Sequence, residues 1–395
     1  NNLININEES FMSNKENNVL NNASEEVSTD NTEAKNASLN QINEYYSDKK
    51  GGFDDFDFVE QYSESTEVKH ENQLKDNEAD AAISVGVIGI GGGGGKIAKA
   101  FLDLGFNKTL LINTTEKDQP LNIDQKHFVH IPGSDGAAKD INIGKKAFNE
   151  NGAVVEDAIR TKFGKVDWLI VCAGGGGGTG SSTAALSPIF ERYLESIQAE
   201  GKVLYVITQP TAQEKLNSTI KSNANQLLKD LKNKPHVVLD NEKQTQLLRG
   251  KVGILGLLPT ANKTFGKLFL QVLKLAGEKS PIQSFDSKDL ERCLKTDKRM
   301  FIGSTMVRKA SDNLGAEIFQ NCMKRSPCPD PQGRPATGAM LLIITPEMAE
   351  DPEMSKHLDA AVSYVGGRTD TLFSGVYIRE SLPGLVAILV LNGLD

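Results

Sequence analysis

Two runs of five glycines, each set between an apolar segment and a helical pattern, are the strongest chemical signal in this chain. The first, residues 91–95, lies within ISVGVIGIGGGGGKIAKA, and the second, residues 174–178, lies within LIVCAGGGGGTGSST. A glycine-rich turn from strand to helix presents bare backbone N–H groups to an anion at the positive end of a helix dipole. One such turn indicates a phosphate site, so two in one domain indicate a polyphosphate held from two sides.

Two standard phosphate-binding motifs do not account for the first run. Residues 89–94 satisfy the dinucleotide pattern GxGxxG, but the next strand ends NTT (residues 113–115), without the acid that would hold a ribose. A P-loop would need Gly in place of Ile90 and Ser or Thr in place of Ile97. A nicotinamide-dependent oxidoreductase is therefore a poor alternative, since it also has no use for the second run.

The segments that position these glycines alternate between apolar runs and amphipathic helical patterns. Strands are expected at residues 83–90, 109–113, 127–131, 166–172, 202–208 and 236–240, and later at 298–307, 338–346, 371–378 and 385–393. Near-continuous Val/Ile/Leu strands separated by helices predict a parallel sheet covered on both faces. Ligands of such sheets bind beyond the carboxyl ends of the strands. Both glycine runs fall at that edge.

The expected fold class is therefore α/β, with a parallel, Rossmann-like sheet, a long central helix and a smaller α+β C-terminal domain. We assign residues 81–255 to the phosphate-binding domain, 256–296 to the central helix with its following loop, and 297–395 to the smaller domain with a mixed sheet. Residues 1–80 hold 19 Asp and Glu against 6 Lys and lack apolar periodicity. We expect this acidic stretch to be disordered.

Smaller signals bound the setting of the protein. Residues 43–62, NEYYSDKKGGFDDFDFVEQY, are either a solvated spacer or a short docking motif that folds on a partner. The four cysteines form no CxxC pair and no metal-ligand pattern with His, which favours reduced core thiols and a cytoplasmic location. No apolar run reaches the roughly 18 residues of a membrane span, and no signal-peptide pattern is present.

The second glycine run and its surroundings resemble the tubulin/FtsZ family of GTPases. GGGTGS (176–181) matches the tubulin signature, and the order of the other segments is similar to the FtsZ branch. These segments are VIGIGGGGGK (87–96), LINTT (111–115), GSDGAAKDINIGKKA (133–147), TQPTAQE (208–214) and LDNEKQ (239–244). The resemblance implies a site for GTP or GDP with Mg²⁺. Its residues would be Gly91, Gly92, Gly93, Gly94, Gly95, Lys96, Asn113, Gly136, Ala137, Gly175, Gly176, Gly177, Gly178, Thr179, Gly180, Ser181, Pro210, Glu214, Asn241 and Asn262.

SFDSKDLERCL (284–294) resembles the acidic loop with which members of this family complete the active site of the neighbouring subunit. The resemblance implies that Asp286 and Asp289 are catalytic. From the residues alone, two carboxylates three positions apart at a helix start favour an N-cap and a first-turn acid over a catalytic pair.

The resemblance implies a divergent FtsZ-like protein, from a phage, a plasmid or a specialised bacterial lineage. It would polymerise head to tail into filaments, coupled to GTP hydrolysis, in cell division, DNA segregation or phage positioning. Ser284 and Lys263 depart from the family pattern and favour an alternative, a nucleotide-binding structural filament with little or no GTPase activity. Mg²⁺ would be held by nucleotide and water, since no protein cage is visible.

The expected partners are further copies of the chain. An adaptor could bind the acidic N-terminal stretch, whose charge disfavours direct nucleic-acid binding. Insertion into a membrane is not expected.

Overall fold

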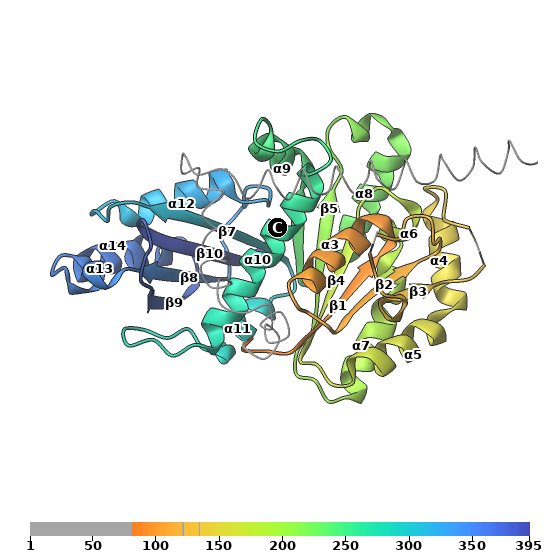
Figure 1. Cartoon of the computed structure of the whole chain (residues 1–395), viewed down its shortest axis with the longest axis horizontal. Coiled ribbons are helices and arrows are strands. Elements are labelled where there is room, and N and C mark those ends of the chain that lie inside the picture. Colours follow the sequence, from red (N-terminus) through yellow and green to blue (C-terminus); the bar gives the residue numbers. More distant parts are fainter. Residues whose placement is uncertain (1–80, 121, 134) are drawn as a thin grey trace, which may run out of the picture. The chain divides into compact units, whose positions relative to one another are not determined.

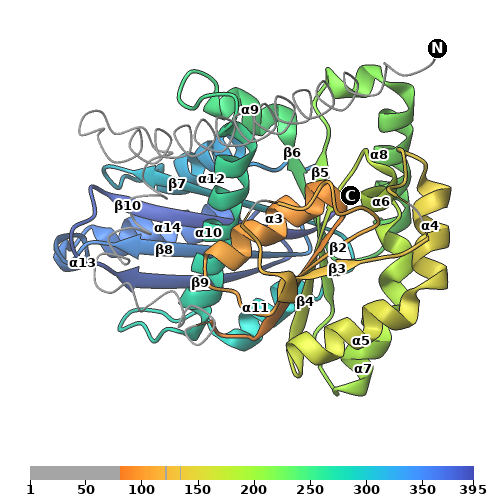
Figure 2. The same ribbon diagram turned by 45° about the vertical axis from the view of Figure 1, so that its right-hand side comes forward.

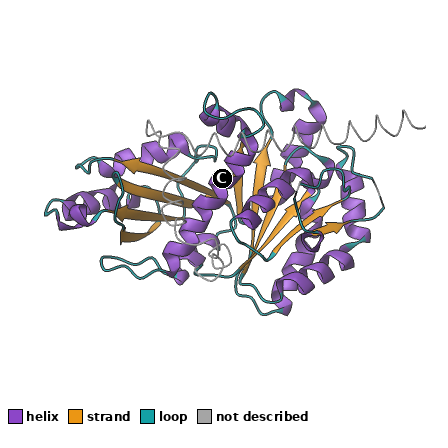
Figure 3. Cartoon of the chain, viewed as in Figure 1, coloured by secondary structure: helices purple, strands orange, loops and turns teal. Residues whose placement is uncertain are grey.

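The computed structural model describes residues 81–395 except 121 and 134, and within these residues the strands form one ten-stranded sheet (Figure 1, Figure 3). The expectations for residues 1–80 lie outside the described residues. The strands are β1 (Val85–Ile90), β2 (Thr109–Asn113), β3 (Phe128–His130), β4 (Trp168–Gly174), β5 (Val203–Gln209), β6 (His236–Asp240), β7 (Arg299–Val307), β8 (Thr337–Ile344), β9 (Thr371–Ile378) and β10 (Leu385–Leu394). The α-helices are α3 (Gly91–Asp103), α4 (Ile141–Glu150), α5 (Gly152–Phe163), α6 (Gly178–Ser181), α7 (Ser187–Ser196), α8 (Ser218–Leu231), α9 (Asn241–Leu248), α10 (Leu257–Gly277), α11 (Ser287–Leu294), α12 (Leu314–Arg325), α13 (Pro346–Glu350) and α14 (Met354–Gly366).

The parallel half of the sheet has the strand order β3-β2-β1-β4-β5-β6. From β1 the strands follow one another outward through β2 to β3, and from β4 they follow one another in the opposite direction through β5 to β6. The strand order therefore reverses between β1 and β4. Ligands of open α/β sheets bind at this point, outside the carboxyl ends of the strands. Gly89 pairs with Cys172 and Ile90 with Ala173, and each glycine run follows at once. The expected parallel α/β sheet is confirmed.

The C-terminal half is mixed, as expected. Strand β10 pairs antiparallel with both β7 and β8, and β9 pairs parallel with β8. Strands β9 and β10 follow one another in the chain but are separated in the sheet by β8. The two halves are joined where β6 pairs with β7 over only two positions, His236 with Arg299 and Val237 with Met300.

Alternate side chains of the parallel strands enter two hydrophobic clusters, one on each face of the sheet. Val87 faces the cluster that includes α3 and α10, whereas Ile88 faces the cluster formed with α4, α5, α7 and α8. The ring of Phe101 on α3 lies edge-on to Phe265 and Phe269 of α10, with centroids 6.2 Å apart in both pairs. Helix α10 therefore packs centrally, as expected, and Figure 2 shows it beside α3.

Two stretches with helical periodicity, residues 143–164 and 182–201, are each interrupted. The pattern over residues 143–164 is divided at Asn151, whose side chain donates to the Ala147 carbonyl at 2.8 Å and closes α4 before Gly152 starts α5. The pattern over 182–201 becomes a 3₁₀ turn (Thr183–Leu186) followed by α7, with Pro188 in its first turn. Proline lacks the N–H that a continuous helix needs, so the helix restarts there.

All four cysteines are free and buried, as expected for core thiols. Burial raises the pKa of the Cys293 and Cys322 thiols to about 12. Within the described residues, no helix combines the length and apolar character needed to cross a membrane.

Candidate functional site

The two glycine runs touch each other through backbone atoms at the ends of β1 and β4. A Cβ added to Gly93 would lie 3.1 Å from the Cα of Gly174, and one added to Gly94 would lie 2.1 Å from the carbonyl oxygen of Cys172. Gly91 has a φ of +69°, which side-chain-bearing residues rarely adopt. Glycine is therefore needed here for close packing of α3 on β4. The sequence predicted a loop before the helix, but residues 91–95 are the start of α3 itself.

Part of each glycine run is also exposed to solvent. Gly93 and Gly177 are exposed, and no atom would lie within 4 Å of a Cβ on Gly177. Helix α3 has no side-chain cap at its N-terminus, where the N-cap position is Ile90. The unpaired N–H groups of its first turn are therefore available to an anion. Of the residues assigned to this segment, Lys96 is exposed and Gly92 is half-buried.

Hydroxyl groups stabilise the loop that carries the second glycine run, residues 174–181, called the signature loop below. The Thr179 and Thr114 hydroxyls lie 2.8 Å apart, and the hydroxyl of Ser181 accepts from the Gly176 N–H at 3.1 Å. Both Thr179 and Ser181 are buried. In the structure these hydroxyls take part in hydrogen bonds of the loop, and their contact with a nucleotide stays a prediction. Gly175, Gly178 and Gly180 are buried in the same loop.

The loop after β3 lies against the signature loop in a strained conformation. Gly136, Ala138 and Lys139 have φ values of +87°, +45° and +65°. A non-glycine residue in this region costs about 1–2 kcal/mol, and such strain is concentrated at functional sites. The buried Ala137 would contact a Cβ on Gly178 at 2.7 Å, so the two loops are in close contact.

The side chain of Asn223, on α8, fastens these two loops together. Its amide donates to the Lys139 carbonyl at 2.8 Å and to the Gly176 carbonyl at 3.0 Å. Sequence reasoning missed this residue, because it lies in an otherwise ordinary polar stretch of α8.

An ion pair stabilises the other side of the loop after β3. Lys117 and Asp135 form a salt bridge, and the Thr115 hydroxyl donates to Asp135 at 3.0 Å. The hydrogen bond from Lys117 holds the pKa of the Asp135 carboxyl below its usual range. Asn113, at the end of β2, is buried and accepts from the Thr114 N–H at 2.9 Å.

The ends of β5 and β6 supply the remaining predicted residues. Pro210 is buried, and the carboxylate of Glu214 accepts from the Thr211 N–H at 2.7 Å. Asn241 is the first residue of α9, and Asn262 lies in the second turn of α10. Asn262 is only 7% exposed.

Asp286 and Asp289, called the acid pair below, lie at the edge of the sheet opposite to the glycine runs. The end of α10 returns to the start of β1, where the Ala82 N–H donates to the Leu273 carbonyl at 3.0 Å. Lys288 on α11 lies 3.8 Å from Glu200, shortly before β5 begins. In Figure 1, α11 lies below the sheet and α9 above it. The structure therefore does not bring Asp286 and Asp289 to the glycine runs of the same chain.

Asp286 and Asp289 form a capping box at the start of α11. The Asp286 carboxylate accepts from the Lys288 and Asp289 N–H groups at 2.9 and 3.0 Å, and the Asp289 carboxylate accepts from the Asp286 N–H at 3.3 Å. Asp286 remains exposed. Beside it, the hydroxyl of Ser284 accepts from the Ser280 N–H at 2.9 Å and so has a structural role. The N-cap geometry expected from the residues alone is present.

Comparison with known proteins identifies the fold. No protein-family model matches the chain. The structure is similar to a GTPγS-bound protofilament of CetZ2 from Haloferax volcanii, with a TM-score of 0.64, 18% identity, and coverage of 79% of this chain and 93% of that one. It is similar to a GTPγS-form protofilament of TubZ from Bacillus thuringiensis serovar israelensis, with a TM-score of 0.67, 19% identity, and coverage of 80% and 89%.

A third similar structure is TubZ of Clostridium botulinum phage c-st, with a TM-score of 0.59, 22% identity, and coverage of 82% and 93%. CetZ and TubZ proteins belong to the tubulin/FtsZ superfamily. The sheet order, the central helix and the matched coverage lead to one conclusion: this chain has the tubulin/FtsZ fold.

Proposed function

We propose that the protein binds GTP and GDP at the carboxyl edge of its parallel strands and polymerises head to tail into filaments. The observation that carries the proposal is the separation of the two groups of residues, with both glycine runs at one edge and the acid pair at the other. Head-to-tail stacking brings opposite edges of successive subunits together. Each nucleotide would then meet Asp286 and Asp289 of the next subunit.

Within one subunit, the open amides of residues 91–95 and 175–178 would bind the phosphates. Ala137 and its strained neighbours would lie near the γ-phosphate, and Glu214 would hold the ribose. Asn241 and Asn262 would contact the ribose or the guanine. We propose residues 81–255 as the nucleotide-binding domain, 256–296 as the connecting helix and acidic loop, and 297–395 as the smaller domain.

Hydrolysis needs a group that orients or deprotonates the attacking water, and a carboxylate can do both. Asp286 is exposed and so can reach a neighbouring subunit. The described residues contain no group of three His, Cys, Asp or Glu side chains able to hold a metal. We expect Mg²⁺ to be carried by the nucleotide phosphates and water, where it would neutralise charge.

The similar CetZ2 and TubZ structures support this proposal because they are protofilaments with bound GTPγS or of the GTPγS form. The buried free thiols suit a cytoplasmic protein. The role of the filament, whether division, DNA segregation or phage positioning, would follow from its partners.

The capping box favours a second candidate, a nucleotide-binding filament with little GTPase activity. In that case Asp286 and Asp289 would serve only to start α11. The substitution Asp286→Asn separates the two roles, because Asn caps a helix as well as Asp but cannot take a proton. For a catalytic Asp286, we expect Asp286→Asn to bind GTP and assemble normally, with phosphate release reduced about 10²- to 10⁴-fold. Unchanged phosphate release would establish the structural role.

A mixing experiment tests whether the site is shared between subunits. Gly177→Trp should block the nucleotide site without disturbing packing, since the space around Gly177 is open. Alone, this variant should not hydrolyse GTP, and Asp286→Asn should hydrolyse it only slowly. Together they should recover activity, because the blocked subunit can lend its Asp286 to an intact neighbouring site. A mixture as inactive as its parts, despite co-assembly seen by electron microscopy, would contradict the shared site.

Assembly itself is tested by light scattering. Filaments should form with GTP and Mg²⁺ and be scarce with GDP. Equal polymer without any nucleotide would rule out nucleotide-driven assembly.

A further inference from the structure

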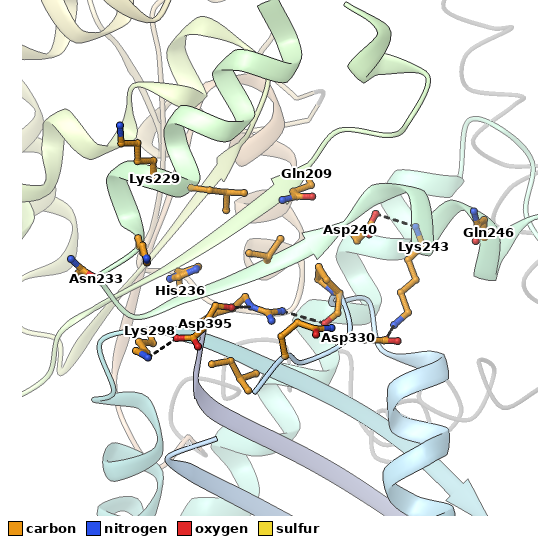
Figure 4. A pocket seen from close by; sticks show the side chains of 17 residues that line it. Gln209, Lys229, Asn233, His236, Asp240, Lys243, Gln246, Lys298, Asp330 and Asp395 are labelled. Atoms are coloured by element: carbon orange, nitrogen blue, oxygen red, sulfur yellow. Dashed lines mark hydrogen bonds and ion pairs between the residues drawn. The ribbon is translucent and has the colours of Figure 1, made fainter. Parts of the chain in front are cut away.

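A cavity of about 930 Å³ lies where the two halves of the sheet meet, and the proposed function does not use it (Figure 4). One wall comes from the end of α8 and from β6, and the other comes from the start of β7 and the segment that follows α12. His236, Val238 and Asp240 line it from alternate positions of β6, which share one face of the strand. The cavity contains none of the glycines assigned to the nucleotide.

Positive charge exceeds negative charge around this cavity. Five Lys and Arg side chains line it against three aspartates. Lys243 pairs with Asp330 at 2.8 Å and Lys298 pairs with Asp395 at 2.7 Å, as Figure 4 shows. Lys229 and Lys232, from the end of α8, are exposed and have no ion pair within the described residues. Both ammonium groups can therefore meet an anionic ligand, although Lys232 also attracts the Asp395 carboxylate.

The cavity also offers apolar surface. Leu228, Val238, Pro329 and Leu394 are part of its lining. A small inorganic anion would leave this surface exposed to water. Burial of apolar area stabilises a complex by about 25 cal/mol per Å². The lining therefore suits a ligand that combines carboxylates with large apolar groups.

We propose that this cavity is the docking site of residues 54–60 of the same chain, DDFDFVE. This segment has four carboxylates, two phenylalanines and a valine. In an extended peptide, Phe56 and Phe58 fall on one side, with Asp55 and Asp57 on the other. The phenylalanines would contact the apolar lining while the carboxylates meet Lys229 and Lys232. Ring faces also attract nearby ammonium groups.

The chain is long enough for this contact. Twenty residues separate Glu60 from Ala81, and extended chain spans about 65 Å at 3.3 Å per residue. A folded unit of this size has a radius of gyration of about 20 Å. A tether of this length also gives an effective concentration in the millimolar range, so that even a weak contact would be populated.

Carbodiimide cross-linking of the full-length protein tests the proposal. The reagent joins a lysine to a carboxylate only when the two are in direct contact. We expect links from Lys229 or Lys232 to acids of residues 54–60, identified by mass spectrometry. The yield should fall with rising salt. Salt screens the attraction between exposed charges, with a screening length of about 8 Å at 0.15 M, and this attraction brings the segment to the cavity.

Two matched variants serve as controls. Phe56→Ser with Phe58→Ser keeps every acid and should reduce these links to the yield of Lys309 and Lys324, which are exposed and outside the cavity. A free DDFDFVE peptide should compete, whereas DDSDSVE should not. Equal yields for cavity and control lysines, or insensitivity to loss of both phenylalanines, would overturn the proposal.

Isotope labelling decides which chain supplies the segment. When ¹⁵N-labelled and unlabelled full-length proteins are mixed at low concentration without nucleotide, links should form only within one isotope. Mixed links in the statistical proportion would overturn docking within one chain and assign the segment to a second copy.

Discussion

The hydroxyl of Tyr377 accepts a hydrogen bond from the backbone N–H of Phe285 at 3.0 Å. The same hydroxyl donates to the Leu275 carbonyl at 2.7 Å, and all of these groups are buried. One side chain of β9 thereby joins the last turn of α10 to the segment that leads into Asp286. The acid pair is thus positioned by the C-terminal half of the sheet.

We expect Tyr377→Phe to weaken this connection. The substitution leaves the buried Phe285 N–H without this acceptor, which costs about 1–3 kcal/mol in the free energy of unfolding, whereas the Leu275 carbonyl keeps the Glu278 N–H at 3.2 Å. Phosphate release should fall while GTP affinity stays unchanged, since the glycine runs lie at the other edge. Urea unfolding and phosphate release are the measurements. Tyr364→Phe is the control, because Tyr364 is half-buried on α14 with the Arg368 guanidinium over its ring, and it should change neither.

Gly94 and Gly177 should respond differently to the same substitution. Gly94→Ala places a methyl group against the Cys172 carbonyl, so α3 must shift away from β4 and the protein should be destabilised by several kcal/mol, of the order seen for severe overpacking. Gly177→Ala meets no atom and should unfold at the same urea concentration as wild type. Its nucleotide affinity, measured by fluorescent GTP binding, should change instead. Equal destabilisation of both variants would show that Gly177, like Gly94, is needed only for packing.

The capping box predicts a difference in stability between two Asp286 variants. Asp286→Ala removes the side chain that accepts from the first N–H groups of α11 and should cost about 1 kcal/mol. Asp286→Asn should cost only a few tenths of that value, since Asn is an equivalent cap. Thermal unfolding of the three proteins checks the order. Asn as destabilising as Ala would mean that the negative charge, through the helix dipole, matters more than the hydrogen bonds.

His236 predicts a pH dependence of stability. Burial lowers the pKa of its imidazole, and its Nδ1 lies 2.8 Å from the Lys234 carbonyl. In the unfolded chain the His236 imidazole takes up a proton near pH 6.5, whereas in the folded protein it is protonated only at lower pH. Stability from this group is therefore complete above about pH 6.5 and falls below it, by up to about 1.4 kcal/mol per pH unit, until the folded pKa is passed.

Urea unfolding at pH 7.5 and pH 5.5 measures this loss. His236→Asn can keep the hydrogen bond to Lys234 but does not titrate, so its two values should lie closer together than those of wild type. An unchanged difference between the two pH values would assign the pH dependence to other groups.

The strands and the site edge could be predicted because both depend on local sequence. Val/Ile/Leu runs such as residues 109–113 and 371–378 match β2 and β9 at both ends. The glycine runs could be placed at the carboxyl edge because each directly follows a strand. Contacts between distant segments could not be predicted: Asn223 is 84 residues from Lys139, and only the fold brings them together. The packing role of Gly94 was hidden for the same reason.

Strand β10 lies between β7 and β8 although it is the last strand of the chain. A nascent chain leaves the ribosome from its N-terminus, so all six strands around the glycine runs are available once residue 240 has emerged. Strands β7 and β8 must wait for residues 385–394, with unpaired edges and with side chains such as Leu341 and Ile343 unburied. A chain interrupted during translation before residue 385 would therefore carry a folded phosphate-binding half. Its C-terminal half would be incomplete, with exposed strand edges and apolar side chains. Such a product would be a substrate for chaperones and proteases.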